Sequence, residues 1–154
     1  MLLVSAALHQ LAAVVWVGGM FFAYLVLRPA LAELGPSARL GVWRAVFSSF
    51  FRWVGASIVV LFATGYVMVF AGWGGFGEVG LHVHLMHGLA LVMLAIFGAL
   101  VHGPWRRLRT AKAAGDDAAA GAALGGIRRL VAVNLALGLV TVVLGASGRW
   151  WGAP

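Results

Sequence analysis

Four long stretches of this chain carry no charged side chain, which limits the folds open to it more than any other feature. They are Leu2–Leu27, Trp53–Gly77, Val79–Trp105 and Leu130–Gly148. A helix needs roughly 20 apolar residues to cross the hydrocarbon core of a bilayer. In lipid the backbone hydrogen bonds must be satisfied internally, and the alternation typical of barrel strands is absent. We therefore expect an all-α integral membrane protein, an up-down-up-down four-helix bundle.

The composition agrees with a membrane protein and bounds its chemistry. Of the 154 residues, 63% are hydrophobic and 10% charged, whereas a soluble domain carries roughly a quarter charged residues. We expect a single transmembrane domain over residues 1–154, with helices over about 2–31, 42–73, 80–105 and 127–150 and a basic loop over 106–126. The first apolar run is too long for a signal-peptide core, so we expect a retained helix. The absence of cysteine excludes disulfides, iron–sulfur clusters and covalently attached c-type haem.

The basic residues are distributed unevenly between the connections. Only Arg149 flanks the exterior side, whereas nine residues flank the first and third connections: Arg28, Arg39, Arg44, Arg106, Arg107, Arg109, Lys112, Arg128 and Arg129. Such a bias is the positive-inside pattern. We expect both basic connections in the cytoplasm, both termini on the exterior, and a multi-pass location in a bacterial inner membrane. The net charge of +7 then has a topological origin, and we expect no nucleic-acid partner.

Histidines gather at the exterior end of the predicted bundle. His9 lies near the start of the first helix, and His82, His84 and His87 open the third as His-Val-His-Leu-Met-His. The first and third helices run in the same direction, so His9 and His87 are expected at nearly the same depth. Ionisable side chains inside a bilayer are costly and mark functional sites. The matched pair predicts a metal site or the axial ligands of a haem.

Haem b between His9 and His87 is the first interpretation of this pair. The first and third helices of such a bundle lie on a diagonal, which is about 13 Å long for neighbouring axes 8–10 Å apart. Two imidazoles with an iron between them fit that span, and histidine is a standard axial ligand of haem. We expect His84 as the substitute ligand and Trp16, on the stripe of His9, as a lining residue. Arg149 is either a partner of the haem propionates or an exposed interfacial arginine.

Copper is the rival interpretation. His82, His84, Met86 and His87 supply imidazole and thioether groups, which suit copper. His84 and His87 are three residues apart and share one helix face, whereas His82 and Met86 form a second face. One helix cannot bring all four groups onto one ion, and His82 is interpreted as an interfacial polar residue. His102, at the opposite end of the third helix, is interpreted as interfacial too.

Two further features lie outside the histidine cluster. Arg52 and Asn134, in the cytoplasmic halves of the second and fourth helices, are candidates for a quinone or anion site, although snorkelling to the interface explains Arg52 equally well. The fourth helix also presents small and polar residues on one face: Asn134, Gly138, Thr141, Gly145 and Gly148. Small residues at such spacing let membrane helices approach closely. The stripe predicts either tight helix packing or a flat wall for a macrocycle.

Several short motifs resemble those of the CopD-like membrane proteins, a superfamily named for a copper-resistance protein of the inner membrane. They are Leu8-His9-Gln10-Leu11-Ala12-Ala13-Val14-Val15-Trp16-Val17-Gly18-Gly19, Thr64-Gly65, Arg106-Arg107-Leu108, Arg128-Arg129-Leu130 and Asn134-Leu135-Ala136-Leu137-Gly138. The His, Trp and Gly spacing is also similar to that of the HemJ-type protoporphyrinogen oxidases, which are haem b proteins. The resemblance implies a four-helix membrane unit with His9 as a functional residue. A lysine typical of the start of the third helix in many relatives has no counterpart, which weakens any transfer of the oxidase activity.

Three functions follow from these patterns. The first is a membrane-bound b-type haem protein that transfers electrons or performs redox chemistry at the exterior side, because two axial histidines leave no open position on the iron. The second is copper binding or transport. The third is HemJ-like porphyrinogen oxidation or a cofactor-free assembly subunit. The first function implies a membrane oxidoreductase. Its expected partners are the lipid bilayer and a quinone or a periplasmic redox partner. A homo-oligomer is compatible with it.

Overall fold

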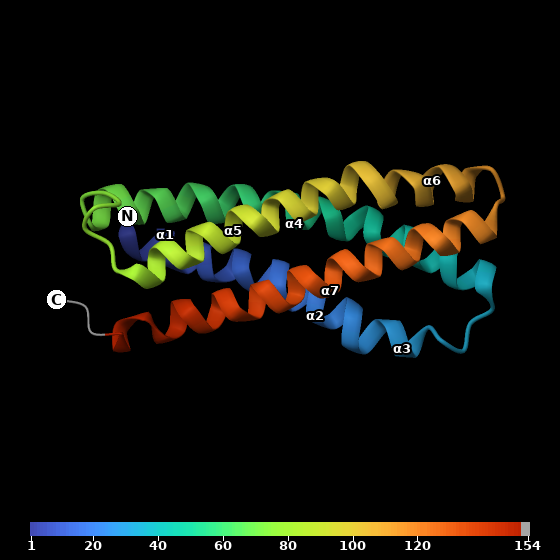
Figure 1. Ribbon diagram of the computed structural model, residues 1–154, viewed down its shortest axis with the longest axis horizontal. Helices are drawn as coiled ribbons and strands as arrows, with labels where there is room; N and C mark the ends of the chain where they lie inside the picture. The colour runs from blue at the N-terminus through green and yellow to red at the C-terminus, as the bar shows by residue number, and fades with distance from the viewer. Residues whose placement is uncertain (152–154) are drawn as a thin grey trace.

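Four long helices run side by side along one axis in the computed structural model, which describes residues 1–151, with Arg149 described by its backbone alone. The described residues contain no strand, and the helices Leu2–Ala30, Pro36–Gly72, Leu81–Ala113 and Asp117–Ser147 are long and apolar enough to cross a membrane. Both described chain ends and one connection lie at the same end of the bundle, with the other two connections at the opposite end (Figure 1). The predicted all-α four-helix membrane architecture is therefore confirmed.

The first helix is continuous but changes its winding twice. It consists of α1 (Leu2–Ala13), the π-helical turn η1 (Val14–Gly18), α2 (Gly19–Phe21), a second π-helical turn η2 (Phe22–Leu27) and α3 (Arg28–Ala30). Wider turns of this kind let a helix shift its face without breaking. They therefore change the direction in which the side chains beyond Ala13 point toward the other helices.

The second helix starts earlier than the sequence predicts. α4 runs over Pro36–Gly72, six residues longer at its start than the predicted helix over 42–73. Gly35 occupies the N-cap position, and Pro36 is suited to the first helical turn because that turn leaves its backbone N–H groups unpaired in any case. The turn chemistry recognised in the sequence is therefore also the start signal of the helix.

Most of the predicted basic loop over 106–126 is helical. After α5 (Leu81–Leu100), the π-helical turn η3 (Val101–Trp105) contains Pro104 and leads directly into α6 (Arg106–Ala113). A short turn then reaches α7 (Asp117–Ser147), which ends in a single 3-10 turn, η4 (Gly148–Trp150).

Local interactions explain why that segment folds. Gly115 adopts a φ of +74°, a conformation that glycine reaches without steric cost. The carboxylate of Asp116 then accepts a hydrogen bond of 2.8 Å from the backbone N–H of Ala119, capping α7. Lys112 and Asp117 form an ion pair of 2.9 Å across the turn. The Ala- and Gly-rich composition of this segment had indicated a flexible loop, whereas the segment forms a helical hairpin.

The hydrophobic core is concentrated toward the basic end of the bundle. Its best-buried large side chains are Trp43, Val54, Leu108 and Ile127. Trp43 stacks on Phe47 with 4.8 Å between the ring centroids, and the aromatic contacts continue along α4 and onto η3. By contrast, the first buried residue of α5 is Met93, so its histidine-bearing half contributes little to the core. The two ends of the bundle are thus packed differently.

Two helix pairs pack most closely: α1 along α4, and α5 along α7. At the α5–α7 contact, a Cβ atom added to Gly138 would lie 3.2 Å from Cε of Met93, and one added to Gly145 would lie 3.0 Å from Cε of Met86. Methionine side chains of α5 therefore fill the space that the glycines of α7 leave open. The stripe of small residues on the fourth helix is a packing surface, and the expectation of a flat wall for a macrocycle is wrong, since side chains of α5 cover it.

Enlarging Gly138 should destabilise the bundle. A Cβ atom at this position would also lie 2.9 Å from Cγ2 of Val17, so Gly138→Leu must push two helices away from α7. We expect a loss of about 1–3 kcal/mol, typical of overpacking, measured by thermal or denaturant unfolding in detergent. Gly121→Leu is the matched control, because no atom lies within 4 Å of a Cβ there. Equal stability of the two variants would contradict this account of the α5–α7 contact.

Candidate functional site

His9 is held against α4 by a hydrogen bond inside the membrane-spanning region. Its Nδ1 lies 3.0 Å from the hydroxyl oxygen of Thr64, a residue of α4 that is itself buried. The imidazole also lies over Gly65, where an added Cβ would come within 3.4 Å of the ring. The Thr64-Gly65 pair therefore provides a hydrogen-bonding partner and the space for the ring. Threonine supplies the hydroxyl, and the adjacent glycine leaves room for the ring.

The hydroxyl of Thr64 also determines which nitrogen of His9 carries the proton. Its single proton is donated to the backbone carbonyl of Val60, at 2.6 Å. The oxygen can then only accept from His9, so Nδ1 carries the hydrogen and Nε2 keeps its lone pair. His9 is thus oriented as a neutral imidazole with Nε2 available, which is the state of a metal ligand.

His87 lies in a different seam, between α5 and the C-terminal part of α4. Its Nε2 is 3.1 Å from the hydroxyl of Tyr66. Its ring also contacts Phe62 and Phe76, with centroids 6.3 Å and 5.2 Å apart. Aromatic side chains of α4 and of the connection after it therefore surround this imidazole on several sides.

His84 approaches the same aromatic ring from one turn earlier. Its centroid lies 6.0 Å from that of Phe76, while His87 lies 5.2 Å from it. Side chains three residues apart on a helix are neighbours, with Cβ atoms about 5–6 Å apart. Within the described part of the chain, His84 is exposed and makes no hydrogen bond. The two imidazoles thus share one face of α5, as the spacing predicts, and both of their rings meet Phe76.

His82 and Met86 face the other way, as their spacing predicts. The ring of His82 lies directly against Gly148, and Met86 lies against Gly145, so both side chains belong to the contact with the fourth helix. Thr141 adds a contact of 4.0 Å between its hydroxyl and the sulfur of Met93 on the same seam. The four candidate copper ligands of the third helix are therefore divided into two pairs on two faces.

The partners of His9 and His87 lie on different sides of α4. Thr64 and Tyr66 are two residues apart, which corresponds to about 3 Å along the helix axis and about 200° around it. The hydrogen bonds therefore hold the two imidazoles on different sides of α4.

Three other residues named from the sequence are not found among these histidine contacts. Trp16 is 3% exposed and belongs to the hydrophobic core, where its role is packing. His102 is exposed at the far end of the third helix and donates Nδ1–H to the carbonyl of Gly98, at 2.9 Å. The side chain of Arg149 lies outside the described residues.

Arg52 and Asn134 have different hydrogen-bond partners and different exposure. Asn134 is 2% exposed and donates its side-chain N–H to the carbonyl of Met93, at 3.1 Å, so it ties the fourth helix to the third. Arg52 is exposed and donates to the carbonyl of Ser48, at 3.2 Å. It lines an open groove of about 780 Å³ together with Arg44 and Arg109. The buried asparagine is absent from that lining.

Within residues 1–151, no group of three or more His, Cys, Asp or Glu side chains is placed to hold a metal ion. A metal site built from these histidines would therefore contain at most two imidazoles and would need further ligands. Sequence reasoning found the histidines but missed Tyr66 and Phe76 as their neighbours. Tyr66 carried a usable signal, because it is a polar side chain inside the apolar run Trp53–Gly77.

The fold and these polar contacts define a multi-pass membrane protein with histidines near one end of its bundle. A family model described as CopD, Copper resistance protein D, matches residues 44–147. The chain therefore belongs to the CopD family. The match includes the histidine cluster of the third helix and excludes His9. No curated protein and no solved structure matches the chain.

Removing the hydroxyl of Thr64 should change the hydrogen bonding of Nδ1 of His9. In Thr64→Val the hydroxyl that pairs with Nδ1 at 3.0 Å is lost, so we expect the ¹⁵N shifts of the ring to change, while Thr64→Ser should preserve them. The measurement is the pair of ¹⁵N chemical shifts of the His9 ring in detergent. Wild-type shifts in Thr64→Val would refute the assigned role of Thr64.

Proposed function

We propose that this protein binds copper at the histidine-bearing end of its bundle, as part of copper handling at a membrane. The observation that carries the proposal is the pair His84 and His87, which share one face of α5 and converge on the ring of Phe76. Membership of a family described by copper resistance supports the choice of metal. Imidazole suits copper, and also zinc, so the metal is a matter for experiment.

The hydrogen bond to Tyr66 fits a metal-ligating role for His87. Metal-bound histidines almost always donate their second ring N–H to an oxygen, which fixes the orientation of the ring. A tautomer of His87 that donates Nε2–H to the hydroxyl of Tyr66, 3.1 Å away, leaves Nδ1 for copper. His84, exposed and free of hydrogen bonds within the described residues, supplies the second imidazole. An exposed ligand also gives copper a route in and out.

Haem b between His9 and His87 receives less support. Hydrogen bonds to Thr64 and Tyr66 hold these imidazoles on different sides of α4, and the family description names copper. Side chains of α5 cover the glycine face of α7 that a macrocycle would need. Electron transfer through a haem, quinone binding and porphyrinogen oxidation therefore do not form part of the proposal.

The proposed orientation puts the histidines outside the cytoplasm of a bacterial inner membrane. The connections 31–35 and 114–116 lie at the end of the bundle that carries most of the arginines, whereas 73–80 lies at the histidine end (Figure 1). Cytoplasmic loops carry the excess of Lys and Arg. Copper would accordingly be met on the exterior side, before it reaches the cytoplasm.

Reporter insertions should establish this orientation. A reporter active only in the cytoplasm should be active when inserted at 114–116 and silent at 73–80, because the positive-inside bias orients the basic end inward. A reporter active only in the periplasm should give the opposite pattern. Periplasmic activity at 114–116 would place the histidines on the cytoplasmic side and reject the exterior location.

Single substitutions should locate the copper site. We expect His84→Ala and His87→Ala each to weaken Cu(I) binding at least tenfold, and Tyr66→Phe to weaken it about 10–100-fold, as loss of a ligand-orienting partner does. The measurement is anaerobic competition with a chromophoric Cu(I) chelator in detergent. His102→Ala is the control, since this exposed histidine lies at the other end of the helix.

An absorption spectrum of the purified protein, oxidised and reduced, tests the rival reading. A colourless protein that binds copper stoichiometrically is the expected result. A Soret band lost in His9→Ala and in His87→Ala would establish haem and refute the copper proposal. Copper affinity equal in wild type, His84→Ala and His87→Ala would also refute this site.

A further inference from the structure

Two buried N–H donors at the basic end of the bundle have no acceptor in the described part of the chain. They are the indole Nε1 of Trp43, on α4, and Nε of Arg128, on α7. Trp43 is 2% exposed, so no solvent reaches its ring. Leaving a buried donor unpaired is destabilising. An acceptor from outside the chain would satisfy both donors in one place.

Both residues line the same small cavity. It lies where the end of the first helix meets α4 and α7, and its lining also includes Tyr24 and Arg28. The guanidinium of Arg28 lies over the ring of Tyr24, with its carbon 5.1 Å from the ring centroid. The first helix therefore adds a guanidinium and a phenol to the lining of the cavity, beside apolar side chains.

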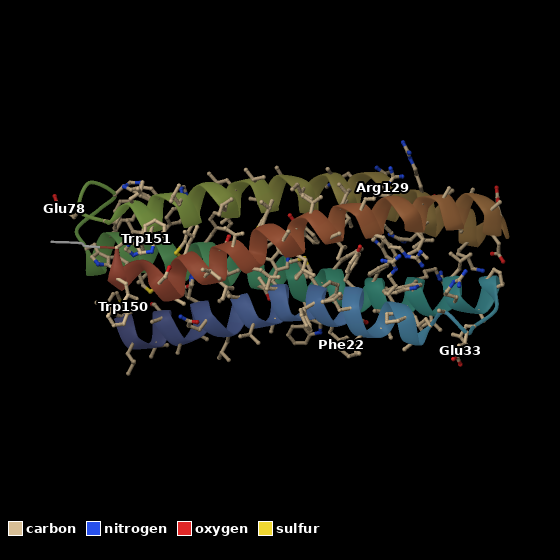
Figure 2. All side chains as sticks on the ribbon, turned by 60° about the horizontal axis from the view of Figure 1, so that its bottom comes forward. Phe22, Glu33, Glu78, Arg129, Trp150 and Trp151 are labelled. Carbon is tan, nitrogen blue, oxygen red and sulfur yellow. The ribbon has the colours of Figure 1, made fainter. Side chains whose placement is uncertain are left out.

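Positive charge accumulates around this cavity without a carboxylate to balance it. Arg28 and Arg39 lie close enough to Arg128 for their charges to repel it. Among the described residues the ion pair found is that of Lys112 with Asp117, on the turn before α7. Figure 2 shows side-chain nitrogen atoms gathered between α7, α4 and the end of the first helix. An anion would remove this repulsion.

The size and depth of the cavity narrow the chemistry of that anion. Its volume of about 10 Å³ is room for a single water-sized atom, such as one oxygen of a larger group. Ser147 lies 19 residues after Arg128, which is about 28 Å along the helix, close to the roughly 30 Å thickness of the hydrocarbon core. Arg128 therefore lies near the boundary where lipid phosphates are found.

We propose that this cavity binds a phosphate group, with one oxygen received by the donors of Trp43 and Arg128 and the outer charge neutralised by Arg28 and Arg39. Guanidinium groups suit phosphate, because their N–H donors match its oxygens. An anionic phospholipid of the surrounding leaflet and free phosphate offer the same group. The site is independent of the proposed copper site, which lies at the opposite end of the bundle.

Ligand-dependent stability of the intact protein tests the proposal. Melting temperatures in a neutral detergent are measured against short-chain phosphatidylglycerol, short-chain phosphatidylcholine and inorganic phosphate. We expect phosphatidylglycerol or inorganic phosphate to raise the wild-type melting temperature at low concentration, with phosphatidylcholine much weaker. Arg128→Gln should raise the apparent dissociation constant at least tenfold, and Trp43→Phe should weaken binding while keeping an aromatic ring in the core.

Arg129→Gln is the matched control, because it removes the same charge from the next residue. Arg129 is exposed and points away from the bundle (Figure 2). Wild-type affinity in this variant supports a built site. A response to phosphatidylglycerol alone identifies the lipid as the source, and an equal response to inorganic phosphate identifies the free anion. No response to either ligand, or equal weakening in Arg128→Gln and Arg129→Gln, would overturn the proposal.

Discussion

The close approach of α5 and α7 governs how the rest of the bundle is spaced. Glycines on α7 admit Met86 and Met93 of α5, and Gly148 of η4 admits His82, so these two helices pack at short range. Aromatic rings such as Tyr66 fill the seam between α4 and α5 instead. Because packing in lipid depends on side-chain size more than on the exclusion of water, glycine and aromatic residues set these two separations. His87 lies in the aromatic seam as a result.

Hydroxyl groups within the apolar helices then orient the imidazoles. Thr64 donates its proton to its own helix and accepts from His9, while Tyr66 reaches across to His87. A polar group in lipid without a partner is costly, and His9 and His87 are each paired with one hydroxyl through one ring nitrogen.

The two ends of the molecule carry different chemistry because they are packed differently. The basic end has the large core, in which Trp43 and Phe47 stack and Leu108 is fully buried. The histidine end has few buried residues on α5 and leaves His84 exposed. The well-packed end carries most of the arginines, whereas the loosely packed end leaves the imidazole of His84 exposed. The proposed anion and copper sites therefore lie at opposite ends of the bundle.

The sequence by itself determined the four spanning helices and the gathering of the basic residues at one end, because hydropathy and charge are local properties. It also divided the histidines of the third helix into two faces, since their spacing alone does so. Only the tertiary structure decided which neighbour each imidazole meets, because that depends on helix rotation and on the winding changes in the first helix. For the same reason it separated Asn134 from Arg52, and it turned the segment 106–126 into a helical hairpin through a cap and an ion pair that composition does not reveal.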